Sequence, residues 1–368
     1  MILCLGVVLI SFPDLLPTEP AQTERTPFAQ LVALRGPQAL GLAVVGGVLG
    51  VLALLRARHR KGARTALVAA VVLAVAAVQA GGLVERGLGA GTQSVGGGTT
   101  DSASWDGTVT VYTLNAMYSG ADAAMVAGQV IDSGADVVVL PEADAAYGAE
   151  VGGLLAEEGL RYTVYTATAG EDSVVSAVPE AATTPHATQT DAGHEEPDTS
   201  VNDTTVLVST ALGEYKAQSQ PGLGYGAVLL KPVGEATWGA GTRPTILGVH
   251  TVPPVGERMG RWRSSVSGVV SACAPEALEP GLIIAGDFNA TIDHAPMRDL
   301  AGCAEAGEQA GIGGLSTWPT SSRTPLLGAT IDHVLVDEAT WRGRAGEVTE
   351  VPGTDHRGVV VELVPARR

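Results

Sequence analysis

Two long apolar segments near the N-terminus limit what this chain can fold into more than any other feature. Residues 38–55 and 66–84 are almost wholly apolar. Each is about long enough to cross a ~30 Å hydrocarbon core at ~1.5 Å per residue. The many glycines and alanines in both segments suit close contact between helices in lipid. A pair of buried helices in a soluble core is the alternative, and the basic segment between the two runs favours the membrane.

That basic segment also predicts an orientation. Residues 56–64 carry five Lys or Arg side chains, and short basic loops stay on the cytoplasmic side. The span at 38–55 then runs inward, the span at 66–84 runs outward, and everything after Val84 lies outside the cell. Residues 1–12 are apolar but short for a span. We interpret them as a clipped or marginal first span, followed by an external loop at 13–37, with the core of a signal peptide as the alternative.

Charge is distributed unevenly along the chain. The net charge is −17, with seven Lys/Arg and three Asp/Glu up to Val84, and 15 against 36 after it, a net of −21. A domain this acidic is not a general binder of polyanions. A phosphate-bearing substrate would need local positive charge, for which a divalent cation is the obvious source.

We expect three parts: a membrane region at 1–84 with two or three transmembrane helices, a flexible linker rich in Gly, Ser and Thr at 85–104, and a folded domain at 105–368. Helical patterns in that domain cover 121–133, 145–158 and 259–272. Strand patterns cover 108–114, 136–140, 162–166, 204–209, 227–230, 245–250, 282–285, 330–336 and 358–363. The polar stretch at 169–202 lacks periodicity and is interpreted as a mobile loop. Because several strands follow one another without a helix, we expect two packed sheets with helices outside.

Polar side chains follow or precede these strands. Asp287 and Asn289, in a Gly-Asp-x-Asn motif, come after an apolar strand and are two residues apart, so on an extended strand end they face the same way. Each alone could equally cap a turn. The other candidates are Asn115, Glu142, His250, Asp332, Asp355 and His356. Carboxylate and amide oxygens suit Mg²⁺ or Mn²⁺, whereas a zinc site would want more closely spaced His or Cys. With a histidine base, this inventory suits attack of water on phosphorus.

In this order, the set resembles the endonuclease/exonuclease/phosphatase superfamily, the DNase-I-like fold, over about residues 108–364. With the N-terminal spans, it also looks like membrane-anchored members of actinobacterial type. The resemblance implies a mixed α/β (α+β) domain, built as a four-layer α/β/β/α sandwich with mainly antiparallel sheets. It also implies that the active site lies at one end, where the strand tips gather.

The resemblance implies a role for each residue. Glu142 would bind the divalent metal, with Asn115 beside it and Asp355 near it. Asp287 would position the attacking water, and Asn289 would hold a phosphate oxygen.

The remaining roles concern three buried-strand residues. His356 would be the base that activates water, or a charge stabiliser. Asp332 would orient His356 and fix its tautomer. His250 would protonate the leaving oxygen or bind the phosphate.

Some positions depart from the common pattern or stay open. Pro141 and His333 stand beside Glu142 and Asp332 where the family often has other residues, and no Lys or Arg takes the usual place after the central strands, Lys231 being the nearest. Trp318 could wall the cleft or pack in the core. Three arginines of the 259–272 region could reach the phosphate or lie on an outer helix face: Arg258, Arg261 and Arg263.

Cys273 and Cys303 are the only cysteines after Val84. An even pair in an oxidising compartment is a disulfide candidate, and two separately buried thiols are the alternative.

We therefore predict a hydrolase of phosphate esters at the cell membrane, multi-pass, with its catalytic domain extracellular. It would use Mg²⁺ or Mn²⁺ and water to cleave a phosphodiester or phosphomonoester. An extracellular nuclease is an alternative that the acidic domain disfavours, so nucleic acid is not the favoured partner. A catalytically inactive binding or structural ectodomain is the alternative of another class. Lipid headgroups and small phosphoesters both remain open as substrates.

Overall fold

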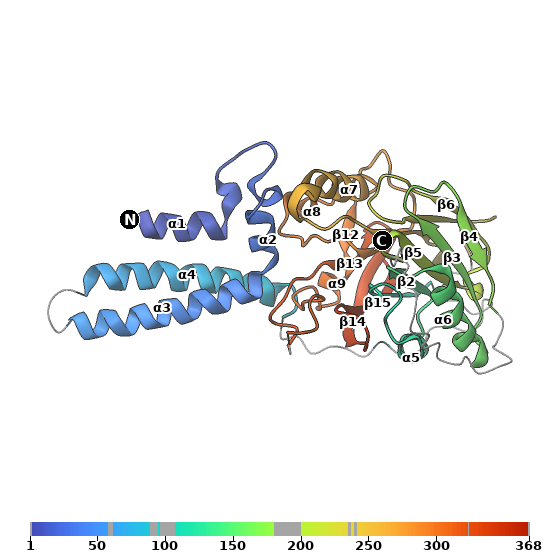
Figure 1. The fold of residues 1–368 in the computed structure, drawn as a ribbon, viewed down its shortest axis with the longest axis horizontal. Coiled ribbons are helices and arrows are strands. Elements are labelled where there is room, and N and C mark those ends of the chain that lie inside the picture. The colour runs from blue at the N-terminus through green and yellow to red at the C-terminus, as the bar shows by residue number, and fades with distance from the viewer. Residues whose placement is uncertain are drawn as a thin grey trace, which may run out of the picture.

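An arm of helices extends from the N-terminal side of the folded domain (Figure 1). It consists of α1 (Ile2–Ser11), α3 (Arg35–Ala57) and α4 (Ala63–Glu85), with α1 beside α4 and α3 packed along α4. By length and composition, α3 and α4 could each cross a membrane. Most of their side chains are exposed, and Leu54 is 73% exposed. Apolar surface exposed on this scale marks an interaction site rather than the outside of a soluble helix pair.

The computed structural model describes residues 2–57, 62–88, 95, 107–179, 200–234, 237–238, 241–322 and 324–366. The middle of the basic loop (58–61), most of the expected linker (89–94 and 96–104) and the centre of the polar stretch (180–199) lie outside the described residues.

Two sheets form the centre of the folded domain. The first has the order β14-β15-β1-β2-β5-β3-β4. Its strands are β1 (Val109–Thr113), β2 (Val137–Pro141), β3 (Tyr162–Thr168), β4 (Val174–Ala177), β5 (Asp203–Ser209), β14 (Trp341–Glu350) and β15 (Arg357–Pro365). The second has the order β12-β13-β11-β10-β7-β6. Its strands are β6 (Tyr215–Ser219), β7 (Val228–Pro232), β10 (Thr245–His250), β11 (Leu282–Asp287), β12 (Cys303–Glu305) and β13 (Asp332–Asp337).

Neighbouring strands of these sheets are mainly antiparallel. The pairs β1–β2 and β10–β11 are parallel, and the other named pairs in the described part of both sheets are antiparallel. A separate small hairpin joins β8 (Thr237–Trp238) to β9 (Gly241–Thr242).

The central strands are apolar along their whole length because both of their faces are buried. On β11, Ile283 and Ala285 pack between the sheets, whereas Leu282 and Ile284 pack on the other side, under a helix. Successive side chains of a strand point to opposite faces, so a strand covered on both faces reads as a continuous apolar run. This explains why the apolar run at 282–285 predicted a strand without any alternation.

Helices cover the outer face of each sheet and complete four layers, α/β/β/α (Figure 1). The helices α5 (Ala123–Ser133) and α6 (Ala145–Glu157) pack on the first sheet, and α7 (Met259–Ser271) packs on the second. Asp122 and Asp144 begin α5 and α6 by accepting hydrogen bonds from Met125 N and Tyr147 N. The expected four-layer sandwich is confirmed.

The region expected as an external loop at 13–37 is instead folded against the domain. It contains η1 (Pro13–Leu15), η2 (Gln22–Glu24), α2 (Phe28–Ala33) and the start of α3. His294 Nε2 lies 2.9 Å from Ala29 O, and Ala295 N donates to Thr23 Oγ1. These partners are more than 260 residues apart in sequence, which is why the local pattern did not predict the contact.

The strand patterns of the sequence did not predict six of the strands: β4, β6, β8, β9, β12 and β14. β4 lies in the polar stretch expected as a loop, and three of its four residues are exposed. β14 carries exposed Arg342 and Arg344 and buried Gly343 and Ala345, so it shows little apolar pattern. Shorter elements complete the chain: η4 (Ser200–Asn202), η5 (Thr210–Leu212), η6 (Gly256–Arg258), α8 (Ala295–Arg298) and α9 (Ala306–Gln309).

The arm is joined to the domain by a cluster of ion pairs, which we call the junction: Arg35, Arg86, Asp293 and Glu308. Arg35 is the first residue of α3, and Arg86 directly follows α4. Arg86 makes two hydrogen bonds to the Asp293 carboxylate, at 3.0 and 3.2 Å, and Arg35 Nε lies 3.1 Å from it. Burial alone would raise the pKa of Asp293, but the hydrogen bonds and charges of Arg86 and Arg35 hold it below its usual range.

We expect Asp293→Asn to destabilise the protein by about 3 kcal/mol near pH 7, because it leaves two arginines facing a buried site without their counter-charge. The midpoint of thermal unfolding in detergent, followed by tryptophan fluorescence, measures this loss. Since the pKa of Asp293 is depressed in the folded chain, its contribution is complete above the unfolded value of 3.8 and is lost as the pH falls below it. The gap between variant and wild type should therefore close in acid.

The control is Glu279→Gln, which removes a carboxylate from the exposed pair with Lys231. An exposed pair contributes little, so this midpoint should barely move. An Asp293→Asn midpoint equal to that of the control at pH 7 would contradict the stabilising role of the junction.

Cys273 and Cys303 are paired as a disulfide at the end of α7 and the start of β12. The bond closes a loop with a sequence separation of 30. Closing a loop of this size stabilises a fold by roughly 3–4 kcal/mol, through the entropy of the unfolded chain.

In protein from an oxidising compartment, we expect alkylation under denaturing conditions to modify one thiol, Cys4, without reductant and three thiols after reduction. Intact-mass spectrometry counts the added groups. Three modified thiols before reduction would show that Cys273 and Cys303 are not bonded in the purified protein.

Candidate active site

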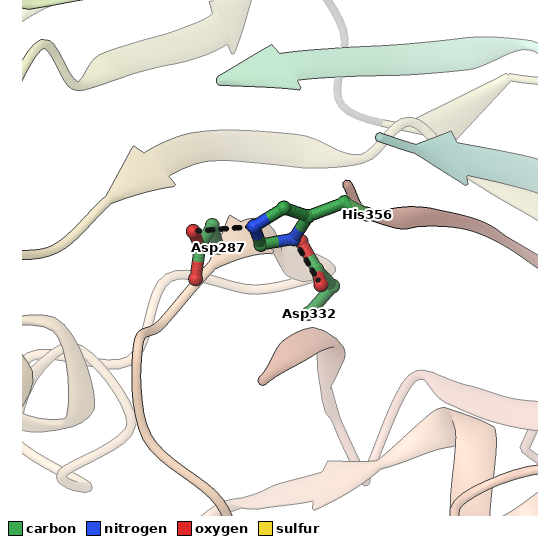
Figure 2. Close-up of side chains that lie close together, drawn as sticks. All are labelled: Asp287, Asp332 and His356. Carbon is green, nitrogen blue, oxygen red and sulfur yellow. Dashed lines mark hydrogen bonds and ion pairs between the residues drawn. The ribbon is translucent and has the colours of Figure 1, made fainter. Parts of the chain in front are cut away.

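The candidate site lies where strands of the second sheet end together (Figure 2). Asp287 is the last residue of β11, His250 is the last of β10, and Asp332 is the first of β13. The register pairs Asp287 with His250 on one side and with Asp332 on the other. Asp287 shares its strand face with Ala285, which packs between the sheets, so these side chains lie at the end of the inter-sheet core.

The first sheet supplies the other half of the site. Asn115 and Glu142 follow β1 and β2, and His356 directly precedes β15. Because β15 is antiparallel to β1, its start lies beside the end of β1. Thr354 holds the two together, since its hydroxyl donates to Asn115 O at 2.7 Å and accepts from His356 N at 3.1 Å. The two sheets therefore deliver their polar ends to one place.

His356 and Asp332 form the tightest pair in the site. His356 Nδ1 lies 2.9 Å from Asp332 Oδ2, and both side chains are buried. His356 Nε2 then lies 3.9 Å from Asp287 and 3.9 Å from Asp355. Burial by itself lowers the pKa of His356, but the carboxylates of Asp332, Asp287 and Asp355 outweigh it and raise that pKa to about 9. The imidazole is held by its Nδ1, and its Nε2 faces the acidic group.

Glu142 and Asp287 are joined by one amide. Asn115 Nδ2 lies 3.0 Å from Glu142 Oε1 and 3.1 Å from Asp287 Oδ2. Burial raises the pKa of both carboxyl groups, that of Asp287 to about 7 with the charge of Asp332 adding to the effect. Two carboxylates that are largely removed from water and share one partner repel each other, and a bound cation relieves that repulsion. Asp287, Asp332 and His356 also offer ligand atoms within 4.8 Å of one another.

His250 closes the site on the side of Glu142. Its Nε2 lies 3.7 Å from Glu142 Oε1 and 3.8 Å from Asp287 Oδ2. Burial and the nearby His356 lower the pKa of His250 to about 3, so its ring is neutral at neutral pH. The ring of Tyr225 packs against it, with centroids 4.8 Å apart.

The backbone around the two motifs has unusual geometry. Gly286 has a φ of +141°, and a Cβ there would lie 1.9 Å from Val249 O, so only glycine fits before Asp287. Asn289 has a φ of +45°, and its N–H donates to Asp287 Oδ1 at 2.7 Å. Glu142 has a φ of +57°, which is uncommon and costly for a residue of this kind.

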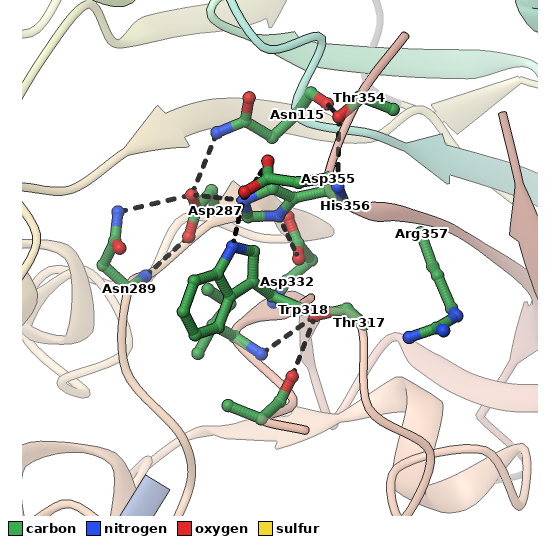
Figure 3. A network of polar contacts seen from close by, with 12 residues as sticks. Asn115, Asp287, Asn289, Thr317, Trp318, Asp332, Thr354, Asp355, His356 and Arg357 are labelled. Atoms are coloured by element: carbon green, nitrogen blue, oxygen red, sulfur yellow. Dashed lines mark hydrogen bonds and ion pairs between the residues drawn. The ribbon is translucent and has the colours of Figure 1, made fainter. Parts of the chain in front are cut away.

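Three residues in the network were missed or left open by the sequence (Figure 3). Trp318 Nε1 donates to Asp355 Oδ2 at 2.8 Å, and its side chain is 37% exposed, so it lies at the rim of the site and not in the core. Thr317 Oγ1 accepts from Ile331 N and Asp332 N, which fixes the start of β13. Thr354 ties β15 to β1. The sequence left open whether Trp318 lines the cleft or packs in the core. Nothing in the sequence around Thr317 and Thr354 indicates their roles, because their partners are distant in sequence.

Other candidates lie away from the site. Lys231 pairs with Glu279 at 2.7 Å, and Arg263 donates to Glu24 O. His333 points to the opposite face of β13, where its ring meets Phe288 edge-on and its Nε2 lies 2.9 Å from Ala290 O. Within the described residues, the only cationic partner of the site carboxylates within 4 Å is His356, while the neutral His250 lies near Glu142 and Asp287.

Comparisons with known proteins show the family of this chain. A family model described as the Endonuclease/Exonuclease/phosphatase family matches residues 113–356. No curated protein matches the sequence. Among solved structures, an endonuclease/exonuclease/phosphatase from Beutenbergia cavernae aligns with 16% identity over 70% of this chain and 72% of its own, at a TM-score of 0.46.

Two further structures align over a similar part of the chain. The human Nocturnin catalytic domain, with a bound sulfate anion, has 12% identity over 70% of this chain and 94% of its own, at a TM-score of 0.43. Sphingomyelinase C from Streptomyces griseocarneus has 17% identity over 69% of this chain and 99% of its own, at a TM-score of 0.41. The family model spans both halves of the site, from the end of β1 to His356. The chain therefore belongs to the endonuclease/exonuclease/phosphatase family.

Proposed function

We propose that the protein is a divalent-metal-dependent phosphoesterase that uses Mg²⁺ or Mn²⁺ and directs water at a phosphodiester or phosphomonoester. One observation carries the proposal: two carboxyl groups with raised pKa, the buried Asp287 and the partly buried Glu142, share the amide of Asn115 and face the buried His356–Asp332 pair. A purely structural domain gains nothing from burying so many polar groups at one point. Members of this family hydrolyse phosphate esters, and this constellation supplies the groups that such a reaction needs.

The donor set fits a hard cation. Glu142 and Asp287 would hold it, with Asp355 at the rim, since carboxylate oxygens are the ligands that Mg²⁺ prefers. Asn115 directs its Nδ2 at both carboxylates, so we assign it to orienting them. A divalent cation held there supplies the positive charge that polarises a water molecule and neutralises phosphate oxygens.

The chain's own residues then divide the remaining work. Asp332 holds His356 Nδ1, so Nε2 faces the acidic groups. The raised pKa of His356 keeps its ring protonated at neutral pH, where it would stabilise charge on the phosphate, and it would accept a proton from water only after losing that proton. His250 is neutral at neutral pH, so we assign it to donating a hydrogen bond to a phosphate oxygen. Asn289, whose Nδ2 donates to Thr251 O at 2.9 Å, lies beside Asp287 and would contact the phosphate.

We also propose where the enzyme works. Residues 1–84 would anchor it in the cell membrane, and the catalytic domain from 105 onward would face outward. The start of the expected linker at 85–104 is not a free tether, because Glu85 ends α4 and Arg86 and Gly87 lie against the domain. The exposed apolar surface of α3 and α4 and the basic residues between them support this topology. The net charge of −21 after Val84 disfavours a nuclease, because phosphate backbones are bound by many Lys and Arg contacts.

The first test is metal dependence. We expect full-length protein in detergent to hydrolyse bis(p-nitrophenyl) phosphate or p-nitrophenyl phosphate with Mg²⁺ or Mn²⁺, and to lose activity in EDTA. Absorbance of released nitrophenolate measures turnover, and calorimetry measures Mn²⁺ binding. Absence of both turnover and Mn²⁺ binding would contradict the enzyme hypothesis and favour an inactive ectodomain.

The second test assigns residues. Glu142→Gln and His356→Ala should each lower kcat by roughly 10²–10⁴-fold, the range for losing a group that acts on the reacting atoms. Glu142→Gln should also weaken Mn²⁺ binding, whereas His356→Ala should leave it nearly unchanged. The matched control, Glu276→Gln, replaces an exposed carboxylate and should match wild type.

Circular dichroism and thermal midpoints establish that each variant is folded. A folded Glu142→Gln or His356→Ala variant with wild-type kcat would overturn the role assigned to that residue.

A further inference from the structure

One segment, described at residues 316–322 and 324–329, reaches both the active site and the first turn of the arm. At one end, Trp318 donates a hydrogen bond to Asp355. Thr317 accepts one from the backbone N–H of Asp332, the first residue of β13. At the other end, Leu326 meets the arm: a Cβ on Gly36, the second residue of α3, would lie 2.1 Å from Leu326 O. We call this segment the bridging loop.

The bridging loop is short enough to limit the distance between the two ends. Trp318 and Ala329 exchange backbone hydrogen bonds, at 2.7 and 3.0 Å, so the rim of the site lies directly beside Ala329. Leu326 lies three positions before Ala329, and three residue steps span at most roughly 10 Å. The rim of the active site therefore lies within about 10–15 Å of the start of α3.

The second membrane helix is held as closely. Gly314 N donates to Arg86 O at 2.8 Å, and a Cβ on Gly314 would lie 2.3 Å from Leu83 O. Gly87 comes equally close to the domain, since a Cβ added at this residue would lie 1.9 Å from Gly311 O. Thr317, at the site, lies three positions after Gly314. Both helices thus end against the segment that carries the rim of the site.

These contacts also fix the orientation of the domain. The Asp293 carboxylate binds Arg35 and Arg86, one from each helix, and it lies six residues after Asp287 on the same chain segment. Three close backbone approaches, at Gly36, Gly87 and Gly314, leave no room for the domain to swing. A domain held this way keeps its active site at a fixed distance from the membrane surface.

The distance of the active site from the start of α3 is close to the thickness of the lipid headgroup layer. A bilayer of ~40–45 Å has a core of ~30 Å, so each headgroup layer is roughly 5–8 Å thick. A site within about 10–15 Å of the first residue of α3 lies at or just above this layer. The rim side chains suit this place, since Trp318 and Leu326 are 37% and 47% exposed, and tryptophan favours the membrane–water interface.

We propose that the substrate is the phosphate ester of a lipid headgroup in the same bilayer that holds α3 and α4. This inference rests on the proposed function, and it adds the substrate class and the geometry of attack. A polynucleotide also carries phosphodiesters, but the domain's net charge of −21 repels it. A lipid phosphate is delivered to the site by the anchor and needs no basic surface.

The experiment uses full-length protein reconstituted in vesicles with Mg²⁺ or Mn²⁺. The vesicles contain phosphatidylethanolamine, phosphatidylglycerol, a phosphatidylinositol phosphate or sphingomyelin. Released water-soluble phosphate or phosphorylated headgroup is measured with the lipid in the protein's own vesicles or in separate protein-free vesicles. Bis(p-nitrophenyl) phosphate and a single-stranded oligonucleotide are soluble comparators.

We expect headgroup release from the protein's own vesicles and at least tenfold less from separate vesicles. The double variant Arg35→Gln, Arg86→Gln should lose at least tenfold on the lipid while changing less than threefold on the soluble diester, because the junction lies apart from the catalytic groups. The variant leaves Asp293 buried without its counter-charges, so circular dichroism and the thermal midpoint must show that it is folded at the assay temperature. The matched control, Lys231→Gln, removes an exposed cation remote from the junction and should act as wild type on both.

The outcomes separate the two claims. Turnover of the soluble diester with no lipid cleaved, or a higher kcat/KM on the oligonucleotide, overturns the lipid inference and leaves the phosphoesterase proposal standing. Equal rates on both vesicle populations, or a double variant that keeps wild-type lipid turnover, overturns the docked geometry. Failure on every substrate overturns the proposed function itself, and the lipid inference with it.

Discussion

The register between β11 and β13 is the constraint on which the active site depends. It sets Asp287 directly opposite Asp332, with both side chains on the face that lines the inter-sheet core. A slip of one residue would turn every side chain of a strand to the other face. His333 and Phe288 would then face the cleft, in place of the carboxylates. His356, which comes from the other sheet, has a partner only because Asp332 is held at this position.

The parts of the fold that the sequence predicted are those in which local pattern and burial agree. Strands covered on both faces, such as β2 and β11, are continuous apolar runs and were recognised as strands. The polar residues at their ends, Glu142 and Asp287, stood out because a carboxylate after such a run has no place in a core. Their convergence followed from the order of the motifs, which resembles a known family.

The parts that the sequence did not predict depend on partners far along the chain. The segment at 13–37 folds because it packs on residues such as His294, and nothing in its own composition indicates that surface. β14 has arginines on its exposed face and glycine or alanine on its buried face, so it lacks an apolar pattern. Thr317 and Thr354 look like ordinary loop residues. Their function is to hold strand ends in place, and it becomes visible only when the sheets are assembled.

Glu142 shows how the site and the stability of the fold oppose each other. Its backbone is left-handed, with a φ of +57°, a conformation that glycine or asparagine adopts with far less strain. Its carboxyl group is also partly desolvated beside another acid. For folding alone, this position would favour a small residue without charge. If Glu142 holds the metal as proposed, its cost in stability is balanced by chemistry, and a relative of this chain without that chemistry would be free to drift at residue 142 toward a more stable protein.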